Sequence, residues 1–453
     1  MILTAALGLL ISGARAAAPN SFPVSAPPIP FEEFFLPNGL RVVLSRDSSV
    51  PVVTFSMIFN AGGRNEVRGR SGFAHLFEHM MFEGSKHVPK GGFDRILESY
   101  GGDNNASTHS DFTFYYEVVP AHALPVAAWL DADRVSALNV SSEALHTQIE
   151  VVKEEKRMRV DNEPYGPLLD AEISSHVFSN WQNSHPVIGS FEDLDAASLK
   201  DVKEFFDAYY APKNAILAVV GDFEPAAAKA LITEYFGWIP NKGEVPAVSL
   251  EEPAPAQGRW VKVQDPHAKL PALAFAWKAM PERRSPDYYA LTLLGKALFE
   301  GKSALLFQEL VKKRRSAVSV SGGLGFPTTD WEEFKAPGLF GGFIIHKAGR
   351  SAASVRDELL GTIRKVAGAG IDSRELRRVK TKFRSDWILA QQTSLGRAGK
   401  LLQAALLDGS PAAANSELDR FMAVGPEDVR RAAARYLKPE LGTWFEAVVK
   451  EQP

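Results

Sequence analysis

Residues 73–82 read Phe-Ala-His-Leu-Phe-Glu-His-Met-Met-Phe, the most informative stretch of the chain. On a helix His75 and His79 lie one turn apart on one face, and Glu78 projects beside them. The other residues are apolar almost all round, which predicts a buried helix packed against a sheet. Polar groups in such a helix need partners, so two imidazoles and a carboxylate at one point indicate a metal site. The alternative is two unrelated core histidines.

A zinc site of the catalytic kind needs a third protein ligand and leaves a fourth position for water. A second helix, expected from Ser142 to Val160, carries four acids: Glu143, Glu150, Glu154 and Glu155. Glu150 has polar neighbours one turn away and belongs to a solvated face, whereas three of the four such neighbours of Glu155 are apolar: Val151, Val152 and Met158. We therefore expect Glu155 to point into the protein, with Glu154 intermediate. The alternative is that Glu155 only pairs with Arg159.

Composition narrows the possible chemistry. The 453 residues suffice for two or three domains, and a hydrophobic content of 45% with 23% charged residues is typical of a globular chain. A net charge of −3 gives no positive field for nucleic acid. The absence of cysteine excludes disulfides, thiolate metal sites and cysteine nucleophiles, so any metal is held by His, Asp or Glu.

The chain divides into two similar halves. The segment from Pro240 to Gly258 is rich in proline and has no periodic apolar pattern, which is typical of a linker. On each side we expect two strands, a helix and a late helix-then-strand unit. They lie at 41–44, 52–59, 72–82, 201–210 and 215–220 before the linker, and at 260–263, 272–277, 286–299, 426–436 and 442–449 after it. The pattern predicts an α+β fold of two homologous domains, each a mainly antiparallel sheet packed against helices. We place them at 17–245 and 259–453, with the linker at 246–258.

The N-terminus predicts export. Residues 2–11 form an apolar run, and Ala14-Arg15-Ala16 resembles a cleavage site, so residues 1–16 read as a signal peptide, although no Lys or Arg precedes the run. The alternative is a frayed apolar terminus. No later stretch is long and apolar enough for a membrane span. We expect the mature chain in the periplasm of a bacterium.

Several motifs together resemble one family. His75-x-x-Glu78-His79, with a Glu 76 positions beyond the second His, is similar to the inverted-motif zinc peptidases of the pitrilysin and insulin-degrading-enzyme family, which includes mitochondrial processing peptidase. The resemblance continues in four further segments, Asn105-Ala106-Ser107-Thr108, Pro186-Val187-Ile188-Gly189, Tyr210-Ala211-Pro212 and Val219-Val220-Gly221-Asp222. It covers essentially the whole chain and is strongest in the first half.

The resemblance implies roles for single residues. His75, His79 and Glu155 would hold one Zn²⁺ per chain, and Glu78 would be the general base. Asn105 and Ala106 would face the scissile peptide on an edge strand that pairs with the substrate. Many relatives have an acid at the position of Gln148, so its role near the metal is in doubt.

The second half departs from the family pattern. Ser303 to Leu310 resembles a family motif that active relatives follow with an Arg and, seven residues later, a Tyr, which clamp the substrate carbonyl. Here these positions are Val311 and Val318, which cannot donate a side-chain hydrogen bond. Arg314 and Arg315 lie nearby at the wrong offset.

These observations predict a zinc metalloendopeptidase that cleaves unfolded peptides and serves as the metal-bearing subunit of a heterodimer. The partner would be a homologous subunit with the Arg/Tyr pair. Two alternatives remain: a non-catalytic scaffold of the same fold, and an active homodimer that uses Arg314 or Arg315.

Overall fold

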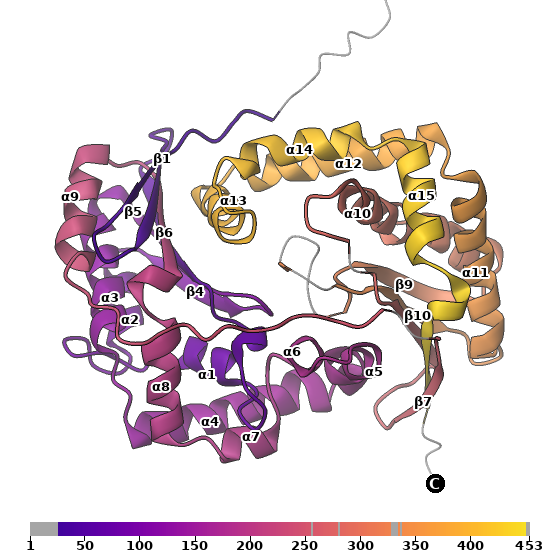
Figure 1. Ribbon diagram of the computed structural model, residues 1–453, viewed down its shortest axis with the longest axis horizontal. Coiled ribbons are helices and arrows are strands. Elements are labelled where there is room, and N and C mark those ends of the chain that lie inside the picture. Colours follow the sequence, from indigo (N-terminus) through magenta and orange to yellow (C-terminus); the bar gives the residue numbers. More distant parts are fainter. Residues whose placement is uncertain (1–25, 255–256, 280, 328–333, 336–337, 450–453) are drawn as a thin grey trace, which may run out of the picture.

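The computed structural model describes residues 26–254, 257–279, 281–327, 334–335 and 338–449. They form two halves, each a β-sheet covered by helices, side by side along the long axis of the molecule (Figure 1). No helix in these ranges is long and apolar enough to span a bilayer. The expected signal peptide, residues 1–16, lies outside the described residues.

The first half contains a six-stranded sheet in the order β1-β2-β6-β3-β5-β4. Its strands are β1 (Glu32–Phe35), β2 (Arg41–Arg46), β3 (Val52–Phe59), β4 (Asp103–Thr108), β5 (Thr113–Pro120) and β6 (Ala215–Gly221). The helices of this half are α1 (Phe73–Met80), α2 (Gly92–Ser99), α3 (Leu124–Ala137), α4 (Ser142–Lys156), α5 (Ile173–Val177), α6 (Trp181–Ser184), α7 (Phe191–Asp195), α8 (Leu199–Tyr209) and α9 (Pro225–Phe236). Strand β6 is buried along its whole length, as its unbroken apolar sequence requires.

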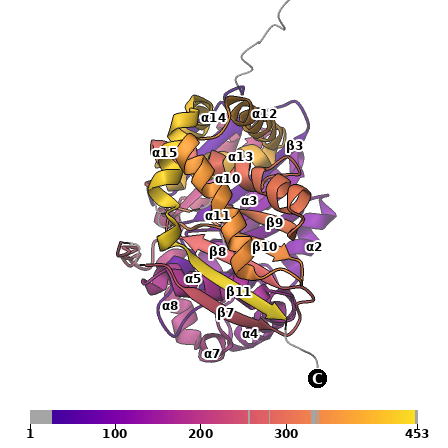
Figure 2. The ribbon, with the colours of Figure 1, turned by 90° about the vertical axis from the view of Figure 1, so that its right-hand side faces the viewer.

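The second half repeats this plan. Its sheet has the order β7-β11-β8-β10-β9, whose strands can be followed side by side in Figure 2. They are β7 (Trp260–Asp265), β8 (Ala272–Trp277), β9 (Ala317–Leu324), β10 (Phe340–His346) and β11 (Thr443–Val449). The helices are α10 (Pro286–Phe299), α11 (Ala352–Ala369), α12 (Ser373–Ala390), α13 (Ser394–Leu407), α14 (Ala413–Ala423) and α15 (Pro426–Tyr436).

The two sheets share one topology. Strands β2-β6-β3-β5-β4 correspond in order to β7-β11-β8-β10-β9, and in each sheet only the first of these pairs is parallel among the described strands. The predicted α+β fold of two similar domains is confirmed.

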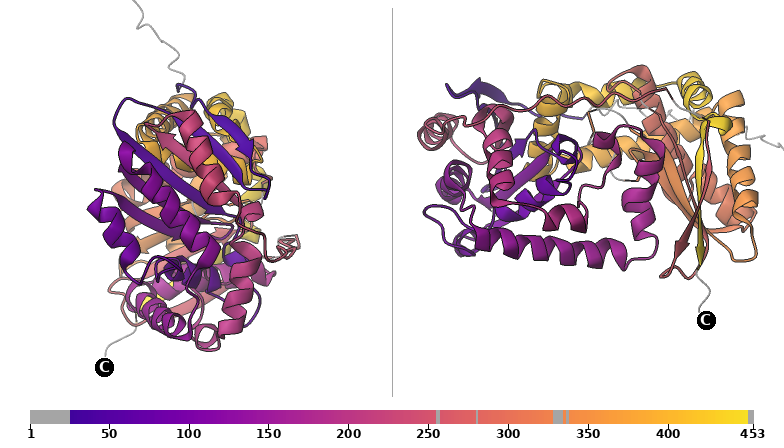
Figure 3. Two further views of the ribbon diagram at one scale, coloured as in Figure 1. Left: turned by 90° about the vertical axis from the view of Figure 1, so that its left-hand side faces the viewer. Right: turned by 60° about the horizontal axis from the view of Figure 1, so that its bottom comes forward.

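A helical segment of each half also packs on the sheet of the other half. Helix α13 of the second half packs against β3 and β6, where Leu401 and Leu402 join a buried cluster with Ile58 and Val220. In the other direction Leu168 and other residues between 165 and 178 pack on the second sheet. Figure 3 shows yellow helices of the C-terminal part behind the indigo strands of the first half. This exchange was not predicted from the sequence.

The connection between the halves is extended but anchored. Between the end of α9 and the start of β7 the described residues contain neither helix nor strand. The side chain of Glu252 in this segment is nevertheless fully buried. Its carboxylate accepts hydrogen bonds from Lys278 Nζ at 2.8 Å and from the backbone N–H groups of Ser179 at 3.0 Å and Asn180 at 2.9 Å. The segment therefore fixes the two halves to each other as well as joining them.

Candidate metal centre

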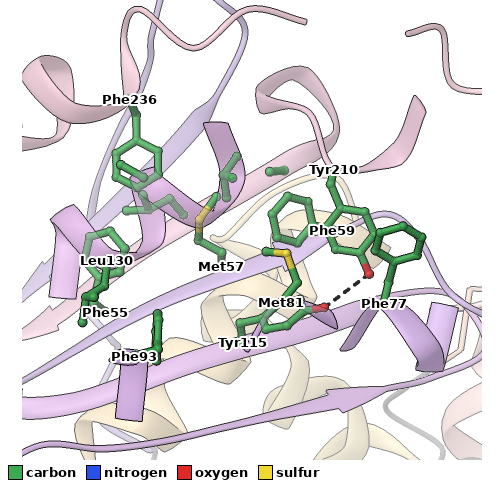
Figure 4. Packing of buried hydrophobic residues seen from close by; sticks show 14 of the residues in the cluster. Phe55, Met57, Phe59, Phe77, Met81, Phe93, Tyr115, Leu130, Tyr210 and Phe236 are labelled. Atoms are coloured by element: carbon green, nitrogen blue, oxygen red, sulfur yellow. Dashed lines mark hydrogen bonds between the residues drawn. The ribbon is translucent and has the colours of Figure 1, made fainter. Parts of the chain in front are cut away.

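Helix α1 is held in the core by its apolar side. Leu76, Phe77 and Met80 are fully buried, and the Phe77 ring stacks on Phe205 with 5.2 Å between centroids. Figure 4 shows Phe77 beside Tyr210 and Phe59, with Tyr115 below them. Three residues from 71 to 81 are only half-buried, namely His75, Glu78 and His79. The apolar pattern that predicted a buried helix thus leaves one narrow polar face.

This face meets Glu155 from the last turn of α4. One possible ligand atom from each of His75, His79 and Glu155 lies within 4.8 Å of the other two. His75 Nε2 is 3.6 Å and His79 Nε2 is 3.2 Å from the same Oε2 atom of Glu155. The two imidazole rings are nearly perpendicular, at 84°. The second carboxylate oxygen of Glu155 pairs with Arg159 at 2.9 Å, so the ion pair considered as an alternative exists alongside the cluster.

The donor set fits zinc. Two imidazole nitrogens and one carboxylate oxygen suit Zn²⁺ better than Mg²⁺ or Ca²⁺, which prefer oxygen ligands only. In the described part of the chain, His75 Nδ1 is buried without a hydrogen-bond partner. Burial and the neighbouring His79 lower the pKa of His75 to about 4, and the hydrogen bond from His79 holds the pKa of Glu155 below its usual value. A neutral imidazole and an ionised carboxylate are the forms that bind metal.

Glu78 has a partner of its own. Thr108, the last residue of β4, donates its hydroxyl hydrogen to Glu78 Oε2 at 2.6 Å. Burial raises the pKa of Glu78, and the bond from Thr108 opposes the rise. A carboxylate with a raised pKa beside the His/Glu cluster has the properties of a general base. Thr108 belongs to a motif quoted from the sequence, but its contact with Glu78 was not foreseen.

Asn105 and Ala106 lie on β4, at the edge of the first sheet. Ala106 pairs with Tyr115 of β5, and the Ala106 backbone N–H is bonded to the Asn105 side-chain oxygen at 2.8 Å. A peptide that adds to this edge would replace the side-chain oxygen of Asn105 by its own carbonyl.

The side chain of Gln148 contacts Glu83, which is outside the His/Glu cluster. Its side-chain amide donates to Glu83 Oε1 at 2.6 Å, and the other oxygen of Glu83 is 2.7 Å from Lys90 Nζ. The carboxylate beside Gln148 therefore comes from Glu83, three residues after α1, which the sequence pattern did not single out.

The helix-face argument for Glu155 was partly wrong. Val152 is buried, but Val151 and Met158 are 42% and 62% exposed. Glu155 is oriented by the two histidines and Arg159 and not by an apolar surround. Glu150 and Glu154 are exposed at the surface, where they pair with Lys153 and Arg157.

Val311 and Val318, which stand at the positions of the Arg/Tyr pair, lie in the second half of the sequence, whereas the His/Glu cluster lies in the first half. Val311 packs against the core of the second half, and Val318 on β9 is half exposed. Arg314, considered as a substitute donor, is bound by Glu309 at 2.5 Å and lies 3.9 Å from Glu358.

Two family models and several named proteins are similar to this chain. Residues 41–190 match the model for insulinase, peptidase family M16, and residues 196–383 match the model for the peptidase M16 inactive domain. The zinc protease PqqE of Helicobacter pylori is 30% identical over 420 residues, which is 91% of both chains. The chain belongs to peptidase family M16. His75, Glu78, His79 and Glu155 all fall in the part that matches the first of these family models.

Solved M16 structures share the whole fold. A protease from Helicobacter pylori superposes with a TM-score of 0.86 at 29% identity, covering 93% of this chain and 99% of that one. The periplasmic protease PqqL from Escherichia coli gives a TM-score of 0.74 at 17% identity, covering 94% of this chain and 48% of that one. At 17% identity, the similarity to PqqL shows a shared fold and nothing more.

Proposed function

We propose that this M16 protein is a zinc metalloendopeptidase with one Zn²⁺ held by His75, His79 and Glu155. The observation that carries the proposal is the convergence of these three side chains within 4.8 Å, next to a carboxylate held by Thr108. The relatives named zinc proteases support it. Zinc in such a site acts as a Lewis acid and makes water more acidic.

The residues of the chain have separate tasks. The two histidines and Glu155 bind and orient the metal. Glu78, positioned by Thr108, takes the proton of the attacking water and transfers it to the leaving amine. Strand β4, with Asn105 and Ala106, holds an unfolded peptide as an added strand. We propose the domain bounds 17–245 and 259–453, joined by 246–258, with this chemistry in the first domain.

We propose further that the chain is the metal-bearing subunit of a heterodimer. Val311 and Val318 offer no side-chain donor to the substrate carbonyl, and Arg314 is occupied by carboxylates of its own half. A homologous partner with Arg and Tyr at these positions would supply the donors, which are typically worth about 10²–10³ in rate. We place both subunits in the periplasm, supported by the apolar N-terminal run.

Glu78→Gln tests the chemistry. This change keeps the three ligands and nearly the same side-chain volume, so zinc should remain near one per chain while peptide hydrolysis falls by about 10²–10⁴. Metal content measured on the same preparation is the control. Retained hydrolysis refutes the role of Glu78, and a wild-type chain without zinc favours the scaffold alternative.

The partner is tested separately. Peptide turnover by this chain alone, over a range of concentrations, is compared with an equimolar mixture with a homologous chain that has the Arg/Tyr pair. We expect slow turnover alone and a rise of at least about 10² in the mixture. Full activity of the lone chain favours the homodimer alternative.

A further inference from the structure

A second buried pair of ionisable groups lies at the N-terminus of helix α1, outside the His/Glu cluster. Glu66, between the 3₁₀ turn Gly63–Asn65 (η1) and α1, has no exposed side-chain surface. Its Oε1 accepts the backbone N–H of Ala74 at 2.8 Å, and its Oε2 accepts that of Gly72 at 2.9 Å. These are donors at the N-terminus of α1, where a carboxylate is favoured by the helix dipole. Ala74 directly precedes His75.

His185 completes the arrangement. Its Nε2 is 3.0 Å from Glu66 Oε2, and its Nδ1 is 2.8 Å from the carbonyl oxygen of Trp181. The indole of Trp181 stacks on the imidazole at 3.8 Å between centroids. The imidazole is therefore fixed in its plane, and the side chain is only 5% exposed.

The hydrogen-bond pattern determines the protonation state. Two backbone N–H groups donate to the two oxygens of Glu66, which favours its ionised form. The Trp181 carbonyl can only accept, so His185 Nδ1 donates to it, and toward an ionised Glu66 the Nε2 atom donates as well, which makes the ring an imidazolium. Burial lowers the pKa of His185, but its interactions with Glu66 and with the backbone at Trp181 and Gly63 together outweigh burial and raise it. Burial raises the pKa of Glu66, and its donors oppose that rise.

The backbone brings the two segments together closely. Gly72 has a φ of +88°, and a Cβ there would come within 2.8 Å of the Ile188 carbonyl oxygen. Gly189 has a φ of +82°, and a Cβ there would lie 2.6 Å from Gly72 Cα. Side chains are excluded at both positions, so the segment after His185 is fixed against the start of α1.

We propose that Glu66 and His185 form a carboxylate–imidazolium pair that positions the first turn of α1, and with it His75. They are positioning residues and do not touch the reacting atoms. The effect of the pair on zinc binding through His75 rests on the proposed function. The existence of the Glu66–His185 pair does not depend on that function.

Other ionisable groups around the pair include arginines, tyrosines and Asp193 of α7, which accepts hydrogen bonds from the backbone N–H and the hydroxyl of Ser71 beside Gly72. Arg68 lies 5.7 Å from the centroid of the Trp181 ring, and Arg64 of η1 is bound to Asp111 at 2.7 Å. Tyr209 of α8 donates to the Asn65 carbonyl, and burial raises the pKa of Tyr209 and that of Tyr210. The tyrosines therefore stay neutral where His185 titrates. Because the pKa of His185 is raised on folding, its stabilising contribution is complete below its unfolded pKa of about 6.5 and is lost as pH rises through the folded value.

Three measurements test the proposal. Nitrogen NMR of histidine-labelled wild-type protein, with His185→Gln for assignment, should show both His185 nitrogens protonated near pH 6. Zinc affinity, measured by chelator competition, should fall at least about tenfold in Glu66→Gln and His185→Gln. The melting temperature of the metal-free protein should exceed that of metal-free His185→Gln near pH 6, and the difference should shrink as pH rises.

His176→Gln is the matched control. His176 also bonds a carbonyl four residues back and faces a glutamate, Glu172, but at the surface. The zinc affinity of His176→Gln and the pH dependence of its melting temperature should match those of wild type. A neutral His185 ring, or unchanged zinc affinity in folded His185→Gln, overturns the proposal. If wild type binds no zinc, the proposed function fails, while NMR and the metal-free melting profile still decide the pair.

Discussion

Replacing Thr108 by valine isolates one hydrogen bond to the proposed general base. Thr108 Oγ1 donates to Glu78 Oε2 at 2.6 Å, and valine keeps the shape of the side chain without the hydroxyl. The bond favours the ionised carboxylate against burial, which raises its pKa. A hydrogen bond to a charged group is worth about 1.5–3 kcal/mol, and 1.36 kcal/mol corresponds to about one pKa unit. Because both side chains are half-buried, we take the lower end and expect the pKa of Glu78 to rise by about one unit.

The sign of the effect on activity follows from the role of Glu78. A general base works only when ionised, so kcat/KM falls as pH drops through its pKa. In Thr108→Val the acidic limb of kcat/KM should therefore move to higher pH by about one unit, with less change on the alkaline side. The assay is cleavage of a fluorogenic peptide by the assembled, zinc-loaded enzyme from about pH 5 to pH 9.

Two variants serve as controls for this experiment. Thr108→Ser keeps a hydroxyl and should retain the wild-type limb. Ser107→Ala removes the neighbouring hydroxyl, which faces His109 at 3.0 Å, and should leave the limb in place. An unshifted acidic limb in Thr108→Val would refute the assignment of Thr108 as the partner that holds Glu78 ionised.

Three further predictions concern the metal and the joint between the halves. Glu155→Gln should bind zinc much more weakly, whereas the exposed Glu150→Gln should bind it normally; equal affinities in a chelator titration would contradict the ligand assignment. Lys278→Met leaves the buried carboxylate of Glu252 without its cation and should lower the free energy of unfolding in urea by about 3–5 kcal/mol, with partial recovery when Glu252 is also changed to Gln. Leu402→Ala removes a fully buried side chain between α13 and the first sheet and should cost about 2–5 kcal/mol; a loss below about 1 kcal/mol would mean that α13 contributes little there.

Local patterns predicted the elements that carry the site. The strand β3 and the helices α1 and α10 depend on neighbours a few residues apart, and their observed bounds agree closely with those expected at 52–59, 72–82 and 286–299. The spacing of His75 and His79 also fixes their geometry once the helix is known. Placing Glu155 required a contact between two helices, and the apolar neighbours used for that argument proved to be largely exposed.

Contacts between distant segments could not be predicted from one sequence. Helix α13 has an ordinary apolar face, and nothing in its sequence shows that the face packs on the sheet of the other half. The burial of Glu252 within the predicted linker could not be foreseen, because its partners, Lys278 and the backbone at 179–180, come from both sides of the linker. The contacts of Thr108 with Glu78 and of Glu83 with Gln148 arise from the same kind of long-range packing.

The exchange of helical segments between the halves has an evolutionary consequence. A chain with only one of the two halves would leave one face of its sheet exposed to solvent. Two copies of such a chain would have to exchange helical segments, as in a domain-swapped dimer. Joining the copies in one polypeptide turns that bimolecular association into an intramolecular one with an effective concentration of roughly millimolar. The two halves of the joined chain are then free to diverge in sequence. Gene fusion therefore lets one copy keep the proposed metal ligands while the other copy changes in sequence.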